Sequence, residues 1–287
     1  MPSVANINLK LTQMPVILNS MSEKIPRALT IAGSDSGGGA GIQADLKTFT
    51  AFKVFGMSVL TSITAQNTES VSGIYDLPPD FVKLQIHAVL SDIGVDAVKT
   101  GMLSNEDIIS AVAEKIKQYG IKKLVIDPVM RAKSGDTLLK PEAERALIEE
   151  LLPLAYIVTP NLSEAGALSG IKVSSLEDMR EAARRIKLIG CKFVLVKGGH
   201  LKWSHEAIDI LYDGKKFHDF SSPRIKTKNT HGTGCTYSAA ICAGLAKGLN
   251  AREAIRQAKD YVTEAIRNSL NLGKGHGPLN HFWKFEE

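Results

Sequence analysis

Short apolar segments alternate with amphipathic ones along most of this chain, and that alternation constrains its fold more than any other feature. The segments 27–33, 123–129 and 193–197 are nearly continuous in apolar residues. Strands buried on both faces have this composition, whereas strands with one solvated face alternate polar and apolar residues. The sequence therefore predicts an α/β fold in which a mostly parallel central sheet is covered by helices on both faces and connected by right-handed crossovers.

The other elements can be placed from periodicity and turn signals. Strands are predicted at 27–33, 58–66, 96–101, 123–129, 155–160 and 193–197, and helices at 42–52, 80–93, 105–119, 141–152 and 176–189. The Asp213-Gly214 pair is typical of a tight turn, so 208–212 and 215–220 are predicted to form a hairpin. A buried helix over 237–246 and an amphipathic helix over 251–270 close the predicted fold.

Composition favours one large domain. The chain has 287 residues, of which 44% are hydrophobic, enough to form the core of a globular protein. No internal repeat, low-complexity linker or composition break divides it, so residues 25–287 are predicted to form a single domain. Residues 1–24 are predicted to be a poorly ordered leader, either a frayed arm or a segment ahead of a functional start at Met21.

Charge and cysteine content narrow the classes of function. The net charge is +5, but basic and acidic residues are interspersed, so nucleic-acid binding is not predicted. A mild positive balance is compatible with polyanionic small substrates such as nucleotides. No apolar run of about eighteen residues occurs, so no membrane span is predicted. The three cysteines, Cys191, Cys235 and Cys242, lack zinc-ligand spacing, and an odd number without a secretory signal predicts free thiols in the cytoplasm.

The loop Asn229-Thr-His-Gly-Thr-Gly-Cys-Thr236 runs directly into a buried helix. Backbone N–H groups converge at such a helix start, and the helix dipole adds positive charge, so an anion would be stabilised there. Cys235 lies in the first turn, where the pKa of a thiol is expected to fall. This predicts an anion hole with a built-in base, while the alternative is a glycine turn followed by a packed cysteine.

A second glycine-rich loop, residues 34–41, joins the first predicted strand to the first helix. Such a loop lets a ligand approach the backbone closely. Gly39-Ala-Gly-Ile-Gln-Ala44 matches the dinucleotide-binding pattern weakly, because no following strand ends in an acid about 20 residues on. The chain contains no G-x-x-x-x-G-K-[ST] segment, which excludes a P-loop nucleotide site at the level of motifs.

Polar residues recur at the carboxyl ends of the predicted strands. In open parallel sheets ligands bind outside those ends, so side chains placed there are expected to meet at one site. The residues concerned are Asp35, Gln66, Lys99, Asp127, Asn161, Glu164, Lys197 and the loop 232–235.

Six motifs in this order resemble the ribokinase superfamily. They are Ala32-Gly-Ser-Asp-Ser-Gly-Gly-Gly-Ala-Gly-Ile-Gln-Ala-Asp45, Lys99-Thr-Gly-Met-Leu103, Asp127-Pro-Val-Met130, Thr159-Pro-Asn-Leu-Ser-Glu164, Val196-Lys-Gly-Gly-His200 and Thr227-Lys-Asn-Thr-His-Gly-Thr-Gly-Cys235. Within that superfamily, residues 27–283 are most similar to the hydroxymethylpyrimidine/phosphomethylpyrimidine kinases of thiamine biosynthesis.

The resemblance implies a ribokinase-like three-layer α/β/α sandwich. It also implies a kinase that uses ATP and Mg²⁺ to phosphorylate the hydroxymethyl group of 4-amino-5-hydroxymethyl-2-methylpyrimidine, and then phosphorylates the monophosphate to the diphosphate. Members of this family are typically cytosolic homodimers.

The resemblance assigns roles near the phosphates. Cys235 matches the catalytic base, with Gly232, Thr233 and Gly234 forming the anion hole. The predicted nucleotide-binding residues are Asn161, Glu164, Lys197, Thr230, Gly232 and Gly234. Asp127 and Glu164 match the residues that hold the metal, through hard oxygen atoms. The alternatives are a helix capped by Asn161 or Ser163 with Glu164 in its first turn, and an Asx turn at Asp127.

The resemblance also implies a pyrimidine pocket. A side-chain amide such as that of Gln66 carries both a donor and an acceptor and can pair with an aminopyrimidine edge. The alternative for Asp45 is a solvated acid in the first helical turn, and the apolar pocket residues could be ordinary core. The residues predicted to line the pocket are Ala40, Asp45, Gln66, Met102 and Val129.

Two other functions remain open at the level of sequence. A pyridoxal kinase of vitamin B6 salvage would share the fold and the phosphoryl chemistry, and one chain could carry both activities. A non-catalytic nucleotide-binding sensor is disfavoured, because a pure binder needs no base at Cys235. Residues 130–136 are hypothesised to be a mobile flap near the phosphates, since they follow a strand end and contain a glycine.

Overall fold

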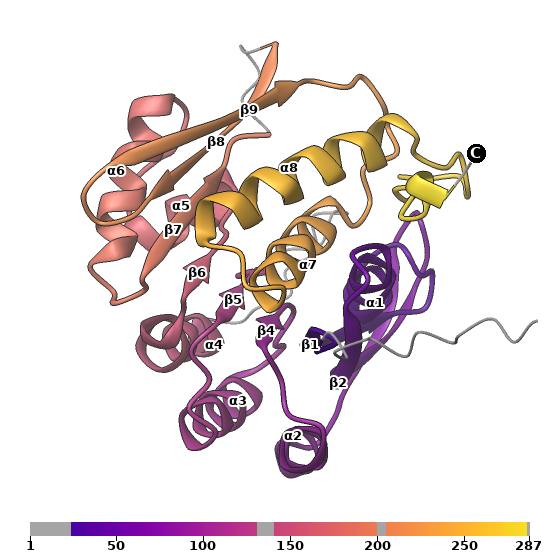
Figure 1. Cartoon of the computed structure of the whole chain (residues 1–287), viewed down its shortest axis with the longest axis vertical. Helices are drawn as coiled ribbons and strands as arrows, with labels where there is room; N and C mark the ends of the chain where they lie inside the picture. Colours follow the sequence, from indigo (N-terminus) through magenta and orange to yellow (C-terminus); the bar gives the residue numbers. More distant parts are fainter. Residues whose placement is uncertain (1–23, 131–140, 200–204, 286–287) are drawn as a thin grey trace, which may run out of the picture.

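The computed structural model describes residues 24–130, 141–199 and 205–285. Within them, nine strands form one sheet in the order β3-β2-β1-β4-β5-β6-β7-β8-β9 (Figure 1). Strand pairs from β2 through β7 are parallel, and β3, β8 and β9 are added antiparallel at the two edges. The strands are β1 Arg27–Asp35, β2 Phe55–Gln66, β3 Val71–Asp76, β4 Ala97–Thr100, β5 Leu124–Ile126, β6 Ile157–Val158, β7 Phe193–Lys197, β8 Glu206–Tyr212 and β9 Phe217–Pro223.

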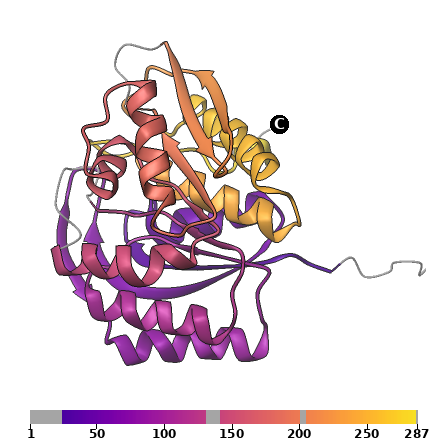
Figure 2. The same cartoon turned by 90° about the vertical axis from the view of Figure 1, so that its left-hand side faces the viewer.

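Helices cover both faces of the sheet, as Figures 1 and 2 show. One face carries α1 Gly41–Ala51, α7 Thr233–Ala246 and α8 Ala251–Arg267, and the other carries α2 Pro79–Asp92, α3 Glu106–Gln118, α4 Pro141–Ala146, α5 Leu162–Ser169 and α6 Leu176–Lys187. The predicted three-layer α/β/α architecture is confirmed. None of the helices in the described ranges is long and apolar enough to cross a bilayer.

Two hydrophobic cores lie on opposite faces of the sheet, and successive strand residues supply them alternately. In β5, Leu124 and Ile126 belong to the core beneath α2–α6, whereas Val125 belongs to the core beneath α1, α7 and α8. All three side chains are essentially inaccessible to solvent. Because successive strand side chains point to opposite faces, a strand between two helical layers must be apolar throughout.

Two local predictions differ from the structure. Strand β3 was not predicted, because five of its six residues are exposed and an edge strand with no buried face has no apolar periodicity. The segment predicted as one helix over 141–152 is α-helical only as far as Ala146. A π-helical turn, Leu147–Leu151, and a 3₁₀ turn, Leu152–Leu154, follow it. Pro153 lacks a backbone N–H, so it cannot donate within a regular helix.

The predicted hairpin is confirmed as β8 and β9. Asp213 accepts hydrogen bonds from the backbone N–H groups of Lys215 and Lys216, and Gly214 takes a φ of +94° in the turn. The hypothesised flap at 130–136 and the predicted leader at 1–24 both fall almost entirely outside the described residues.

Candidate active site

A cavity of about 970 Å³ opens at the carboxyl ends of the parallel strands. That volume lies at the upper end of the range for small-molecule pockets, which suits a reaction with two ligands. Every strand-end residue predicted from the sequence lines this cavity, so their convergence is confirmed. They are Asp35, Gln66, Lys99, Asp127, Asn161, Glu164, Lys197 and residues 232–235, joined by Ala40, Met102, Val129 and Thr230.

The two glycine-rich loops meet at the cavity wall. Gly232 has a φ of +82°, and a Cβ atom built there would lie 1.8 Å from the carbonyl oxygen of Gly39. Only glycine accommodates both the left-handed backbone and this close approach. The contact places the start of α7 against the start of α1, although the two loops are separated by most of the chain.

The amino end of α7 is open toward the cavity. Among the described residues, no side chain caps the helix, and Gly232 occupies the N-cap position. The first N–H groups of a helix have no partner within it, so those of Gly234 and Cys235 remain available to an anion. Thr233 instead turns its hydroxyl group back to the carbonyl oxygen of Thr230, at 2.8 Å.

Cys235 is partly buried at this helix start, but its acidity differs from the prediction. Burial raises the pKa of Cys235 to about 11, outweighing Lys99 and the N–H group of Gly41, which act in the opposite direction. The predicted fall in the thiol pKa is therefore wrong, because loss of hydration exceeds the effect of the helix start. Cys191 and Cys242 are fully buried, one in each of the two hydrophobic cores.

Lys197 and Asp127 form an ion pair beside the open helix end. Lys197 Nζ lies 2.8 Å from Asp127 Oδ1, and a Cβ atom at Gly234 would lie within 3.6 Å of both side chains. Burial disfavours the charge on Asp127, but Lys197 and Lys99 lower its pKa overall. The other oxygen of Asp127 accepts from Ser238, at 3.3 Å. The Asp127 side chain therefore faces the ammonium groups of Lys197 and Lys99. It does not form the Asx turn that was the alternative at this position.

Asn161 and Glu164 form a capping box at the start of α5. The Asn161 side chain accepts from the N–H groups of Ser163 and Glu164, and Glu164 Oε2 accepts from the Asn161 N–H at 2.7 Å. The capping interpretation is thus confirmed. Burial raises the pKa of Glu164 to about 7, with Lys197 opposing the shift and Asp127 adding to it. Two neighbouring buried acids are stable together only while a proton or cation compensates their charge.

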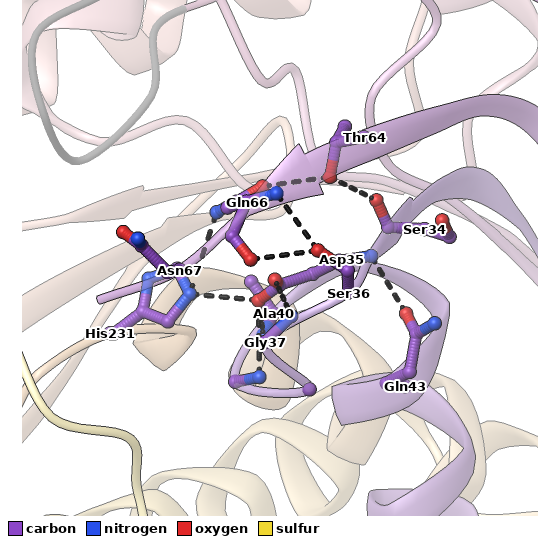
Figure 3. Close-up of polar contacts among 12 residues, drawn as sticks. Ser34, Asp35, Ser36, Gly37, Ala40, Gln43, Thr64, Gln66, Asn67 and His231 are labelled. Atoms are coloured by element: carbon purple, nitrogen blue, oxygen red, sulfur yellow. Dashed lines mark hydrogen bonds and ion pairs between the residues drawn. The ribbon is translucent and has the colours of Figure 1, made fainter. Parts of the chain in front are cut away.

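Asp35 organises the opposite end of the cavity (Figure 3). Its carboxylate accepts from the backbone N–H groups of Gly37, Gly39 and Ala40, at 2.8–3.0 Å, and contacts His231 Nε2 at 2.8 Å. Gln66 is held nearby, because its backbone N–H and carbonyl oxygen both bond to the Ser36 hydroxyl group. Its side-chain amide lies between Thr64 and His231.

The prediction that Asp45 lines the pyrimidine pocket is wrong. Asp45 does not line the cavity: its side chain is fully buried, with Oδ2 2.8 Å from Lys99 Nζ and 2.6 Å from Thr30 Oγ1. The alternative of a solvated helical acid is also wrong. Asp45 lies on the buried face of α1, next to Lys99, and its negative charge balances the buried positive charge of that lysine. Lys99 itself lines the cavity.

Sequence reasoning gave no role to several residues that the fold brings to the cavity. His231 lies in the glycine loop and Asp35 and Lys99 at strand ends, and each was noted without a function. The pair formed by Asp209 and Lys259, at 2.7 Å, was not noted at all. Lys99 and Asp209 could have been recognised from the sequence, because each is a charged residue inside an otherwise apolar strand.

Comparisons with known proteins agree with this geometry. A family model described as phosphomethylpyrimidine kinase matches residues 35–280. The hydroxymethylpyrimidine/phosphomethylpyrimidine kinase of Bacillus subtilis is 50% identical over 258 residues, 90% of this chain and 95% of that protein. A thiamine biosynthesis bifunctional protein of Geobacter sulfurreducens is 54% identical over 96% of this chain, which spans 56% of that longer protein.

Solved structures extend the comparison. An ADP complex of Bacillus subtilis pyridoxal kinase superposes with a TM-score of 0.86 at 44% identity, covering 92% of this chain and 100% of that one. On these grounds the chain belongs to the phosphomethylpyrimidine kinase family, a family of kinases with the ribokinase-like fold.

Proposed function

We propose that this chain transfers a phosphoryl group from ATP to the hydroxymethyl group of 4-amino-5-hydroxymethyl-2-methylpyrimidine, and a second one to the resulting monophosphate. The observation that carries the proposal is the arrangement of a thiol, an open helix end and a lysine in one cavity with a side-chain amide. Cys235, the start of α7, Lys197 and Gln66 all line it. In that order, these groups supply a base, an anion-binding site, a positive charge and a hydrogen-bonding partner for a heterocycle.

Each group has a defined task in this reaction. The N–H groups at the start of α7 and the Lys197 ammonium group would neutralise the charge that spreads over the transferred phosphoryl oxygens. Cys235 would take the proton of the alcohol late, when the oxygen is already bonding to phosphorus. Because the pKa of Cys235 is about 11, its thiolate is a strong base but a rare one at neutral pH. Positioning and charge neutralisation would therefore supply most of the rate.

Asp127 and Glu164 would hold Mg²⁺ together with phosphate oxygens and water. Both are buried and both supply hard oxygen atoms. Lys197 lowers the pKa of each carboxyl group, and Asp127 raises the pKa of Glu164. The described residues contain no group of three metal-ligating side chains, and Mg²⁺ commonly takes only one or two protein carboxylates in phosphoryl-transfer sites. When bound, the ion would supply positive charge beside the phosphates and favour the charged form of Glu164.

Replacing Glu164 by glutamine should raise the stability of the protein at pH 8 and lower its activity. The raised pKa of Glu164 means that the native protein loses stability as pH rises from 4.5 through about 7, where the buried carboxyl group ionises. Glu164→Gln keeps the helix cap but cannot ionise, so it should be more stable than the parent at pH 8 by on the order of 2 kcal/mol.

At pH 5 the same substitution should leave stability nearly unchanged, because Glu164 is then protonated in the parent as well. Thermal unfolding without ligands at both pH values measures the difference. Activity with Mg-ATP should fall at least about tenfold, since one oxygen ligand is lost. A variant that is less stable than the parent at pH 8 would show that the charged carboxylate contributes to folding.

Pyridoxal kinase activity is the second candidate, because a pyridoxal kinase superposes on this chain over nearly its whole length. Only the pocket separates the two reactions, and the Gln66 amide suits an aminopyrimidine edge. The deciding experiment measures ADP release with Mg-ATP and, in turn, hydroxymethylpyrimidine, its monophosphate and pyridoxal. Turnover of both pyrimidines supports the proposed function, whereas a preference for pyridoxal contradicts it.

We further propose that residues 25–287 act as one domain in a cytoplasmic homodimer. Exposed side chains support an interface along β2 and β3, where Ile63 and Tyr75 are cross-strand partners with 47% and 68% of their surfaces exposed. An exposed apolar pair on the edge strand β3 and its neighbour β2 is the kind of surface that a second copy covers.

Charged substitutions at this pair should separate the subunits. The double variant Ile63→Lys, Tyr75→Lys is expected to have half the mass of the parent by light scattering after gel filtration. Leu188→Lys is the matched control, because Leu188 is 86% exposed at the end of α6, at a distance from β2 and β3. Equal masses for the parent and the double variant would exclude this interface.

A further inference from the structure

A glycine segment, Gly273–Gly277, follows the last long helix and is hydrogen-bonded to two loops that lead into the cavity. One is the turn after β2, residues 67–70, and the other is the loop before α7, residues 228–231. The segment consists of three glycines, a lysine and a histidine, so it buries no apolar side chain and adds little hydrophobic stabilisation. Its hydrogen bonds to the two loops are therefore its main contribution to the structure.

The first set of contacts reaches the turn after β2. The His276 N–H donates to the Thr68 carbonyl oxygen at 2.9 Å, and the Gly275 N–H donates to the Thr68 hydroxyl oxygen at 3.2 Å. A Cβ atom at Gly275 would lie 2.0 Å from the same carbonyl oxygen, so only glycine permits this approach. Gln66, the last residue of β2, precedes Thr68 by two positions (Figure 3). The glycine segment thus holds the turn that begins at the Gln66 amide.

The second set of contacts reaches the loop before α7. His276 Nδ1 lies 2.9 Å from the carbonyl oxygen of Lys228, which can only accept, so Nδ1 carries the hydrogen and donates it. The Gly277 N–H donates to Asn229 Oδ1 at 3.2 Å, and the Gly277 carbonyl oxygen accepts from the His231 N–H at 3.1 Å. This loop ends at the N-cap of α7, so the glycine segment also holds the approach to the anion site.

The two loops serve different halves of the cavity. Gln66 belongs to the half proposed for the heterocycle, and the start of α7 belongs to the half proposed for the transferred phosphoryl group. The Ser36 hydroxyl group bonds to the Gln66 backbone itself, and the glycine segment bonds to the turn that follows it. Phosphoryl transfer requires the attacking oxygen to lie in line with the leaving group, so its rate depends on how the two halves are placed.

We propose that the glycine segment aligns the two halves of the site, with His276 as the positioning residue that contacts both loops. Its backbone N–H holds the turn after β2, and its ring holds the loop before α7. Loosening these bonds leaves each half intact but displaces one from the other, so binding is retained and transfer is slowed. The inference rests on the proposed function and identifies what aligns its two substrates.

Gly275→Ala tests the alignment directly. Gly275 does not have a left-handed backbone, so the collision of the new methyl group with Thr68 is the only strain introduced. The variant should lower kcat for hydroxymethylpyrimidine phosphorylation about tenfold and leave KM for ATP and for the pyrimidine within about threefold. The slow release of ADP measured without an alcohol needs only the nucleotide half, and it should stay within about twofold of the parent.

His276 variants test the same alignment without a collision. His276→Ala removes the ring N–H but keeps the backbone N–H, so it should lower kcat by a smaller factor, about threefold. His276→Asn places an amide N–H near the position of Nδ1 and should restore most of the lost kcat. In the Gly275→Ala background the alignment is already disturbed, so adding His276→Ala should cost less than it does alone.

Gly73→Ala is the matched control, because its new Cβ atom would meet only the Ala65 Cβ atom, at 3.9 Å, and it should match the parent in every measurement. Thermal unfolding of all variants should give midpoints within about 5 °C of the parent, which separates misalignment from loss of fold.

Two results would overturn the inference alone. One is an unchanged kcat in both Gly275→Ala and His276→Ala. The other is an equal fall in ADP release without an alcohol, because that would place the damage in the nucleotide half and not in its alignment with the pyrimidine. Absence of pyrimidine turnover in the parent chain would instead overturn the proposed function, and this inference with it.

Discussion

Cys235→Ala is expected to lower kcat by about 10²–10⁴-fold while leaving the protein folded. Cys235 is only partly buried and lines the cavity, so removing its sulfur creates no large void in the core. The start of α7 and Lys197 would remain in place, and the KM values for ATP and for the alcohol should therefore change little. Coupled ADP release, with thermal unfolding as a check on folding, measures both effects.

The pH profile makes this prediction specific to a base. Only the thiolate form of Cys235 can accept a proton. Because the pKa of Cys235 is about 11, the fraction of thiolate rises tenfold with each pH unit below that value. In the parent, kcat/KM should therefore climb between pH 7 and about 10, and this slope should vanish in Cys235→Ala. Full activity in the variant, or a slope that persists, would show that another group takes the proton.

Lys99→Met is expected to destabilise the protein by about 3–5 kcal/mol at pH 8. Lys99 and Asp45 are both fully buried and form a 2.8 Å ion pair, so removal of the ammonium group leaves a carboxylate in the core without its counter-charge. Burial already raises the pKa of Asp45, and loss of Lys99 would raise it further. The penalty should therefore shrink toward pH 5, where the carboxyl group can take up a proton.

Urea unfolding measures this effect, and two controls isolate its cause. Lys99→Met combined with Asp45→Asn removes both charges and should recover much of the lost stability. Lys24→Met breaks an equally short pair, with Asp96, in which Lys24 is 72% exposed, and should cost less than about 1 kcal/mol. Equal losses in Lys24→Met and Lys99→Met would show that burial of the pair has no energetic consequence.

The chemistry of the site was predictable where it depends on neighbours in the sequence. The Gly232–Gly234 segment opens a helix, and Asp127 and Lys197 stand at the ends of apolar strands, so their convergence followed from the parallel sheet. Asp45 could not be placed in this way. A single acid in the first two turns of a helix is usually solvated, and the lysine that neutralises it lies 54 residues away.

The same distinction applies to His231. Its position in a glycine loop gave no indication of a partner, and that partner, Asp35, lies 196 residues earlier in the chain. Strand β3 was missed for a related reason, because an exposed edge strand is formed by pairing with β2 and not by its own apolar pattern.

The sequence by itself determined the layers, the order of most elements and the edge of the sheet where the site lies. Those properties follow from periodicity, turns and strand ends, each of which is local. The tertiary structure alone decided the ionisation of Cys235, the burial of Asp45 and the contact between His231 and Gln66. Hydration and charge at an atom depend on everything packed around it, and in this fold those surroundings come from β1, α1, β4, β5 and α7 together.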